Sequence, residues 1–145
     1  MKTNKILIVA DDSEPSIKAI KYGFGLAREL GAEVTLISVI DVIRSLGNPD
    51  AGIFPDDMLA SEQEKTKAFL INMKDKYSKG IETELLMPVG EIQETILKTA
   101  LKVKAELIVT GTHGRTGLNK LFNGSVAESI IHESSIPVFV VPDRE

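Results

Sequence analysis

The sequence predicts an α/β fold in which an open sheet of five parallel strands carries helices on both faces. Short apolar runs rich in Val and Ile alternate along the chain with longer amphipathic stretches. Such alternation arises from right-handed βαβ crossovers, which bring successive strands into one parallel sheet. The chain has 145 residues, enough for one domain with a sizeable core and too few for two of ordinary size. We therefore expect residues 1–145 to form a single domain.

Local signals define the first strand and the first helix. A continuously apolar run within residues 4–10 predicts a buried strand. Ser13 is suited to cap the following helix, and Pro15 falls in the first turn, where its missing N–H does no harm. Gly31 is expected to end the helix. Its predicted inward face has three- and four-residue spacing and consists of Ile17, Ile20, Phe24, Ala27 and Leu30.

The middle of the chain predicts a strand, a long irregular segment and a polar helix. Residues 34–40 are largely apolar and read as the second strand. Residues 41–55 contain several Gly, Pro and Asn residues, so we expect a loop, with a lid over a ligand as a secondary hypothesis. Residues 57–78 predict an amphipathic helix whose Lys- and Glu-rich side is interpreted as a solvated face. Its expected inward residues are Leu59, Phe69, Leu70 and Met73.

The remaining elements repeat the same alternation. Residues 81–87 predict a third strand that is half exposed, because apolar and polar residues alternate in its first part. A helix is expected after Gly90 and Glu91, with Ile92, Ile96, Ala100 and Val103 inward. Residues 107–110 form the fourth predicted strand. A last helix begins at Val126, and the fifth strand covers the apolar segment 136–141.

The most informative stretch is the glycine-rich loop of residues 111–125. Its glycines and the following serine have the spacing G-x2-G-x9-G-S, which is neither a Walker motif nor a dinucleotide fingerprint. Glycines allow backbone N–H groups to converge on an anion, and the next helix adds its own unpaired N–H groups. Arg115 and Lys120 add positive charge. Phosphate is therefore the expected ligand, although Ser125 and Glu128 would also satisfy a purely structural capping box.

This spacing resembles the ATP-binding signature of the universal stress protein family, and the resemblance extends over nearly the whole chain. The segments Ile6–Ser13 and Ser135–Val141 are similar to the first and last strands of the family. The resemblance implies a Rossmann-like, adenine nucleotide alpha hydrolase-like sheet of order 3-2-1-4-5. In such a sheet ligands bind where the strand order reverses, between strands one and four. Asp12 departs from the family pattern, in which Gly is frequent at this position.

The resemblance also implies a set of nucleotide-binding residues. Asp11 would contact the adenine or ribose, and Val39 would pack on the base. The phosphates would lie against the glycine-rich loop, where the backbone of His113 is expected to matter more than its ring. The implied ligand is ATP, carried with Mg²⁺ or Mn²⁺. The implied binding residues are Asp11, Val39, Gly111, His113, Gly114, Arg115, Gly124, Ser125 and Val126.

The pair Asp11 and Asp12 allows two other interpretations. Paired acids after the first strand also occur in the metal pocket of two-component receiver domains. However, the third predicted strand ends in Leu86-Met87-Pro88 without a phosphoacceptor aspartate, and no lysine follows the fifth. Alternatively, the acids only complement the dipole of the helix that follows them.

Composition excludes several classes of function. The net charge of −4 argues against a general nucleic-acid surface, which requires a basic field. The absence of cysteine excludes disulfides and thiolate chemistry, and the two histidines are too few for a convincing metal site. No apolar run near the N-terminus is long enough for a signal peptide or a membrane span, so we expect no membrane partner and a cytoplasmic location.

Together these observations favour an ATP-binding regulatory protein of the stress response, with slow or no hydrolysis. No catalytic residue is assigned, because the sequence offers no Walker-type lysine and no clear base. The alternatives are a nucleotide-free interaction module of the same fold and a slow ATPase. An adenylating or pyrophosphatase-type enzyme is disfavoured, because no SGGxDS-like loop follows the first strand. An apolar fifth strand at the sheet edge predicts a homodimer formed through residues 136–141.

Overall fold

Strands and helices alternate along the chain as the sequence predicts. The computed structural model describes residues 3–41, 48–52, 54–112 and 126–143. The elements, in order, are β1 (Lys5–Val9), α1 (Glu14–Leu30), β2 (Glu33–Ile37), β3 (Ile40–Asp41), a 3-10 turn (Pro49–Ala51), α2 (Pro55–Tyr77), β4 (Thr83–Leu86), β5 (Val89–Gly90), α3 (Ile92–Lys102), β6 (Leu107–Gly111), α4 (Val126–Glu133) and β7 (Val138–Val141).

The main sheet has five parallel strands in the order β4-β2-β1-β6-β7. Counted along the chain over these five strands, this is the predicted order 3-2-1-4-5. In the centre, Ile6 of β1 pairs with Val34 of β2 and with Leu107 of β6. The receiver-domain interpretation is wrong on this point, because receivers use the flavodoxin-like order 2-1-3-4-5.

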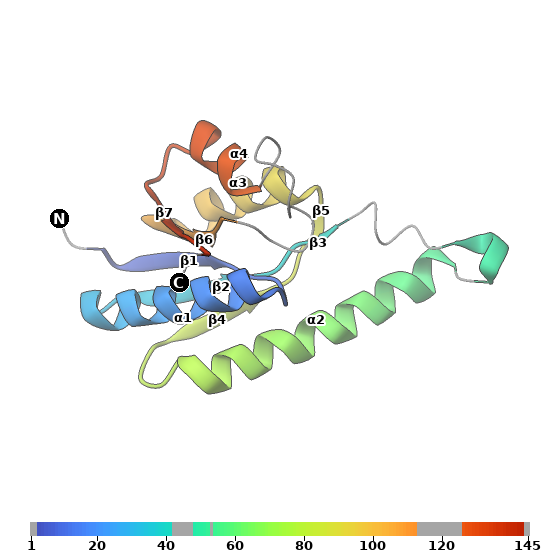
Figure 1. Cartoon of the computed structure of the whole chain (residues 1–145), viewed down its shortest axis with the longest axis horizontal. Helices are drawn as coiled ribbons and strands as arrows, with labels where there is room; N and C mark the ends of the chain where they lie inside the picture. Colours follow the sequence, from blue (N-terminus) through green and yellow to red (C-terminus); the bar gives the residue numbers. More distant parts are fainter. Residues whose placement is uncertain (1–2, 42–47, 53, 113–125, 144–145) are drawn as a thin grey trace.

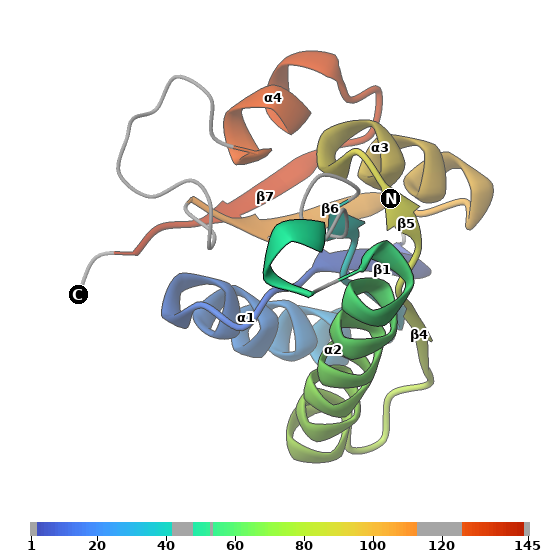
Figure 2. The same cartoon turned by 90° about the vertical axis from the view of Figure 1, so that its right-hand side faces the viewer.

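Helices cover both faces of the sheet and create a separate core on each. Figures 1 and 2 show α1 and α2 on one face, with α3 and α4 on the other. Successive side chains of a strand point to opposite faces, so Ile6 and Ile8 pack under α1 while Leu7 packs under α3 and α4. All three are fully buried. Within the described ranges, no helix is long and apolar enough to cross a membrane.

The ends of α1 follow the predicted chemistry. Ser13 is the N-cap, and its Oγ accepts a hydrogen bond from the backbone N–H of Ser16 at 3.3 Å. Gly31 ends the helix with φ of 68°, in the left-handed region that favours glycine. The expectation that Leu30 faces inward is wrong: its side chain is 39% exposed, because it is the last residue of the helix and lies beyond the sheet contact.

Several predicted boundaries differ from the structure: the third strand covers Thr83–Leu86 rather than 81–87, and the fifth covers Val138–Val141 rather than 136–141. The strand expected at residues 34–40 ends at Ile37, and Ile40 belongs to β3, which pairs with β5 in a separate two-stranded sheet. The helix expected at residues 57–78 begins earlier, at Pro55, because proline is favoured in a first helical turn. The small β3–β5 sheet carries the chain from the end of β2 toward α2 and from the end of β4 into α3.

Candidate functional site

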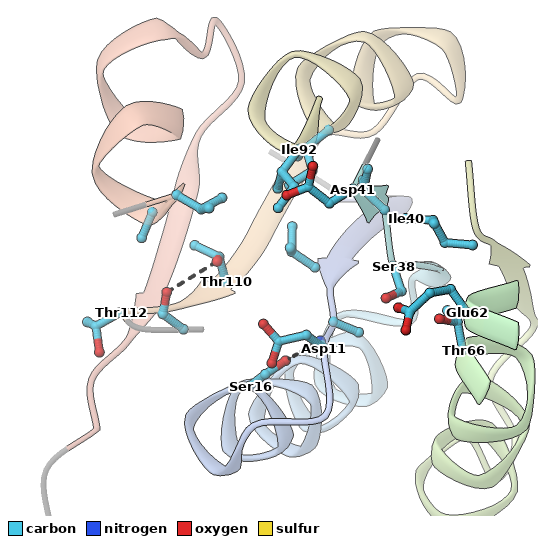
Figure 3. Close-up of a pocket in the computed structure, with 17 residues that line it drawn as sticks. Asp11, Ser16, Ser38, Ile40, Asp41, Glu62, Thr66, Ile92, Thr110 and Thr112 are labelled. Atoms are coloured by element: carbon cyan, nitrogen blue, oxygen red, sulfur yellow. Dashed lines mark hydrogen bonds between the residues drawn. The ribbon is translucent and has the colours of Figure 1, made fainter. Parts of the chain in front are cut away.

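A crevice opens at the carboxyl ends of β1 and β6, where the strand order reverses. Asp11 follows β1 and Gly111 ends β6, and both line the crevice although they are far apart in sequence. Its walls come from the β1–α1 turn, the end of β6, the start of α4, the β2–β3 segment with the start of α3, and helix α2 (Figure 3). This is the position at which doubly wound sheets bind ligands.

One wall of the crevice is apolar. Val39, Ile92 and Val126 line it and at the same time pack against the core under α3 and α4. Ile96 also lines the crevice and is fully buried. Because these side chains are held from behind by the core, they present a fixed apolar surface, as a site for a flat aromatic base requires.

The opposite wall is a rigid polar turn. The backbone N–H of Asp11 donates to Ser16 Oγ at 2.7 Å, and Asp11 Oδ1 accepts from the N–H of Ser13 at 2.8 Å. Ser16 is buried. The Asp11 carboxylate therefore has a structural role in shaping the entry to α1. It also lines the crevice.

The structure describes four of the residues that the resemblance implies: Asp11, Val39, Gly111 and Val126, and all four line the crevice. The other implied residues are His113, Gly114, Arg115, Gly124 and Ser125, which lie outside the described part of the chain.

Gly111 has a packing role that the sequence did not indicate. A Cβ atom at this position would lie 3.0 Å from the backbone oxygen of Pro15 and 3.6 Å from Cβ of Ala19. The absence of a side chain thus lets the end of β6 approach the first turns of α1. Gly111 does not adopt positive φ, in contrast to Gly31, so the conformational reason proposed for the loop glycines does not apply to it.

Helix α2 contributes lining residues that the sequence interpretation missed. Glu62 and Thr66 face the crevice, although residues 57–78 were expected to turn their charged side to solvent. Only 14% of the Glu62 side chain is exposed, against 70% for Lys65. The spacing in the sequence was the available signal. Glu62 and Thr66 lie eight and four residues before Leu70, which is buried in the core, and residues four apart lie on the same side of a helix.

The charged side chains in the described walls of the crevice are all acidic. Asp11, Asp41 and Glu62 line these walls, and among the described lining residues there is no Lys or Arg. Thr112 Oγ1 is buried and has no hydrogen-bond partner within the described residues. In the same part of the chain, no three His, Cys, Asp or Glu side chains converge in a way that would hold a metal ion.

Comparison with known proteins agrees with this architecture. Residues 2–142 match the model of the "Universal stress protein family". The chain belongs to the universal stress protein family. Membership in this stress-response family therefore rests on almost the full length of the sequence.

Individual relatives show the same agreement. Universal stress protein MJ0531 of Methanocaldococcus jannaschii is 38% identical over 97% of this chain and 84% of its own length. The solved structure of MJ0577, from the same organism, superimposes with a TM-score of 0.86 at 29% identity and covers 100% of this chain and 99% of its own. A universal stress protein from Archaeoglobus fulgidus, solved in complex with dAMP, has a TM-score of 0.65 at 22% identity, over 97% of this chain and 98% of its own.

Proposed function

We propose that this universal stress protein binds ATP in the crevice between β1 and β6, and that nucleotide occupancy regulates the protein. The observation that carries the proposal is the path of the chain. It leaves the crevice at Thr112 and returns to it at Val126, so both described ends of the predicted phosphate-binding loop lie at one site. A loop anchored in this way is suited to hold a phosphate group beside the helix that follows it.

The charge of the crevice supports a particular orientation of the nucleotide. The described walls carry carboxylates and would repel a triphosphate. The loop sequence, which lies outside the described residues, contains Arg115 and Lys120, and we expect these two residues to supply positive charge. We therefore infer that the phosphates lie on the loop side, while the nucleoside lies between the apolar wall of Val39 and the polar residues of α1 and α2. The dAMP complex of the relative from A. fulgidus supports an adenine nucleotide.

A metal ion is expected to arrive with the triphosphate rather than to be held by a protein cage. Mg²⁺ is commonly bound through substrate phosphates and few carboxylates, and no three-ligand cluster occurs within the described residues. The residues of the crevice bind and orient the nucleotide in this proposal, and none is assigned as a base. Slow or absent hydrolysis follows, because activation of water requires a positioned base or clamp.

The test is direct detection of nucleotide. Protein purified without added ATP is denatured, and the released nucleotides are separated by anion-exchange chromatography. We expect adenine nucleotide from the wild type and none from Gly124→Val, whose side chain would block approach to the loop backbone, at unchanged circular dichroism. If the stripped wild-type protein also fails to bind added ATP in calorimetry, the proposal is wrong and a nucleotide-free interaction module becomes the better account.

We also propose that β7 forms the interface of a homodimer. Among the described strands, β7 lies at the edge of the main sheet and pairs with β6 alone. Edge strands of apolar sequence recruit further strands unless they are covered. Phe139 of β7 is 42% exposed, and with Tyr22 and Leu26 of α1 it lines a largely apolar groove beside this edge. Two copies related by a two-fold axis would pair these strands and cover the groove.

A further inference from the structure

We propose that Glu62 determines nucleoside specificity at this site, with its carboxylate accepting hydrogen bonds from neutral donors of the nucleoside. These donors are the ribose hydroxyls or the exocyclic amine of the base. The inference rests on the proposed function and adds a recognition element on α2, a helix whose charged residues the sequence assigned to solvent.

The inward face of α2 is apolar toward its C-terminal end and polar toward its N-terminal end. Toward its C-terminal end Leu70 and Met73 are buried in the core beside the sheet. On the same face, toward the N-terminus, the residues become Thr66 and Glu62, and here the helix passes the carboxyl ends of the strands rather than the sheet itself. An inward helical face is ordinarily apolar. A polar segment at the crevice therefore points to a polar occupant.

The described ion pair of Glu62 compensates its carboxylate only weakly. With 14% exposure the side chain has lost most of its water, and removal of a carboxylate from water is unfavourable unless hydrogen bonds replace the hydration. Its described partner is Lys65, with Nζ 3.8 Å from Oε1 and a side chain that is 70% exposed. An ion pair of this length with so exposed a cation stabilises little. Because Glu62 lines the crevice, a donor from a bound ligand could reach its carboxylate and add a hydrogen bond there.

The position of Glu62 assigns it to the nucleoside rather than to the phosphates. It lies with Thr66 and Ser38 on the α2 side of the crevice, whereas Thr112, the second residue of the predicted phosphate loop, lies on the opposite side (Figure 3). Glu62 also borders a smaller adjoining hollow, whose charged lining consists of Asp11, Asp12, Glu62 and the exposed Lys65, so acids outnumber the single described base. An ionised carboxylate only accepts hydrogen bonds, and surrounding acids repel phosphate, so neutral O–H and N–H donors are the groups that fit here.

The experiment measures ATP binding by calorimetry in nucleotide-stripped wild type, Glu62→Ala and Glu64→Ala. Glu64 is a matched control, because it lies on the same helix with the same charge and is exposed. We expect Glu62→Ala to weaken ATP binding roughly tenfold, the loss of one hydrogen bond to a charged group, with no change for Glu64→Ala.

Three analogues identify the donor: 2′-deoxy-ATP, 3′-deoxy-ATP and ITP, which lacks the exocyclic amine. The analogue without the contacted donor should bind the wild type about tenfold more weakly and lose nothing further in Glu62→Ala, as expected for a coupled pair. Equal ATP affinity in all three proteins overturns this inference and leaves the proposed function intact. The inference is also overturned if Glu62→Ala weakens the binding of ATP and of every analogue by one common factor, because the effect then does not come from a contact with one donor. Absence of binding by the wild type overturns the proposed function, and this inference with it.

Discussion

A glycine at position 111 could be required by packing against Pro15 or by close approach of the ligand. Replacement of Gly111 by Ala separates these two reasons. The added Cβ would approach the backbone oxygen of Pro15 to 3.0 Å, whereas ordinary contacts begin at 3.4 Å, so the neighbour must move by 0.4 Å (3.4 − 3.0). That neighbour is backbone in the first turn of α1, and this helix packs along β6 and β7. The strain cannot be relieved by a simple rotation of a side chain.

The expected cost follows from overpacking. Insertion of a methyl group into a well-packed site costs about 1–3 kcal/mol, and loss of glycine flexibility in the unfolded chain returns about 0.4–1 kcal/mol. We expect Gly111→Ala to lower the free energy of unfolding by about 1–2 kcal/mol. For a chain of this size each kcal/mol corresponds to about 2–4 °C, so Tm should fall by about 2–8 °C.

Scanning calorimetry and urea unfolding measure this effect in protein stripped of nucleotide. Gly25→Ala is the matched control, because it lies in α1 and a Cβ there meets nothing within 4 Å. This control should gain about 0.8–1 kcal/mol from helix propensity alone. If Gly111→Ala is as stable as the wild type, the close approach to Pro15 does not explain the glycine. If it also loses ATP binding, the requirement comes from the ligand instead.

Three further predictions concern assembly, chemistry and the entry to α1. Val140→Lys, on the proposed dimer edge, should be a monomer, whereas the wild type and the control Ile71→Lys on α2 should be dimers when their masses are measured by light scattering. A monomeric wild type would contradict this interface. Phosphate release from ATP should be far slower than the ~10 per second of a median enzyme, and fast release abolished by Asp11→Asn would instead identify an ATPase. Ser13→Ala removes the oxygen that accepts from the N–H of Ser16 at 3.3 Å and should cost about 1 kcal/mol in urea unfolding; an unchanged midpoint would show that this cap contributes nothing.

The parts of the fold that sequence predicted correctly depend on local signals. Ser13 and Gly31 delimit α1 through capping and positive φ, which are properties of a few adjacent residues. The buried strands were recognisable from continuous apolar runs. Strands β3 and β5, with two residues each, are too short to show any periodicity, so their pairing was not predicted.

The features of the site that sequence did not predict depend on contacts between distant segments. The packing role of Gly111 requires knowledge that Pro15 lies against it, and nothing near residue 111 in the sequence indicates this. The spacing of Glu62 from Leu70 puts it on the inward side of α2, but only the placement of α2 beside the crevice shows what this side faces there. The family resemblance partly replaced this missing knowledge of distant contacts, because it assigned Asp11 and Val39 to one predicted site.

The most direct test of ATP binding at this crevice is an amide NMR titration of the ¹⁵N-labelled protein with ATP. The account predicts saturable shifts that concentrate at the carboxyl edge of the sheet, in residues 10–12, 37–41, 110–112 and 126–127. The chemical shifts of amides at the opposite edge, such as residues 4–5, 33 and 106, should not change. Unchanged spectra at millimolar ATP, or shifts confined to that opposite edge, would contradict the assignment of the nucleotide site to the crevice between β1 and β6.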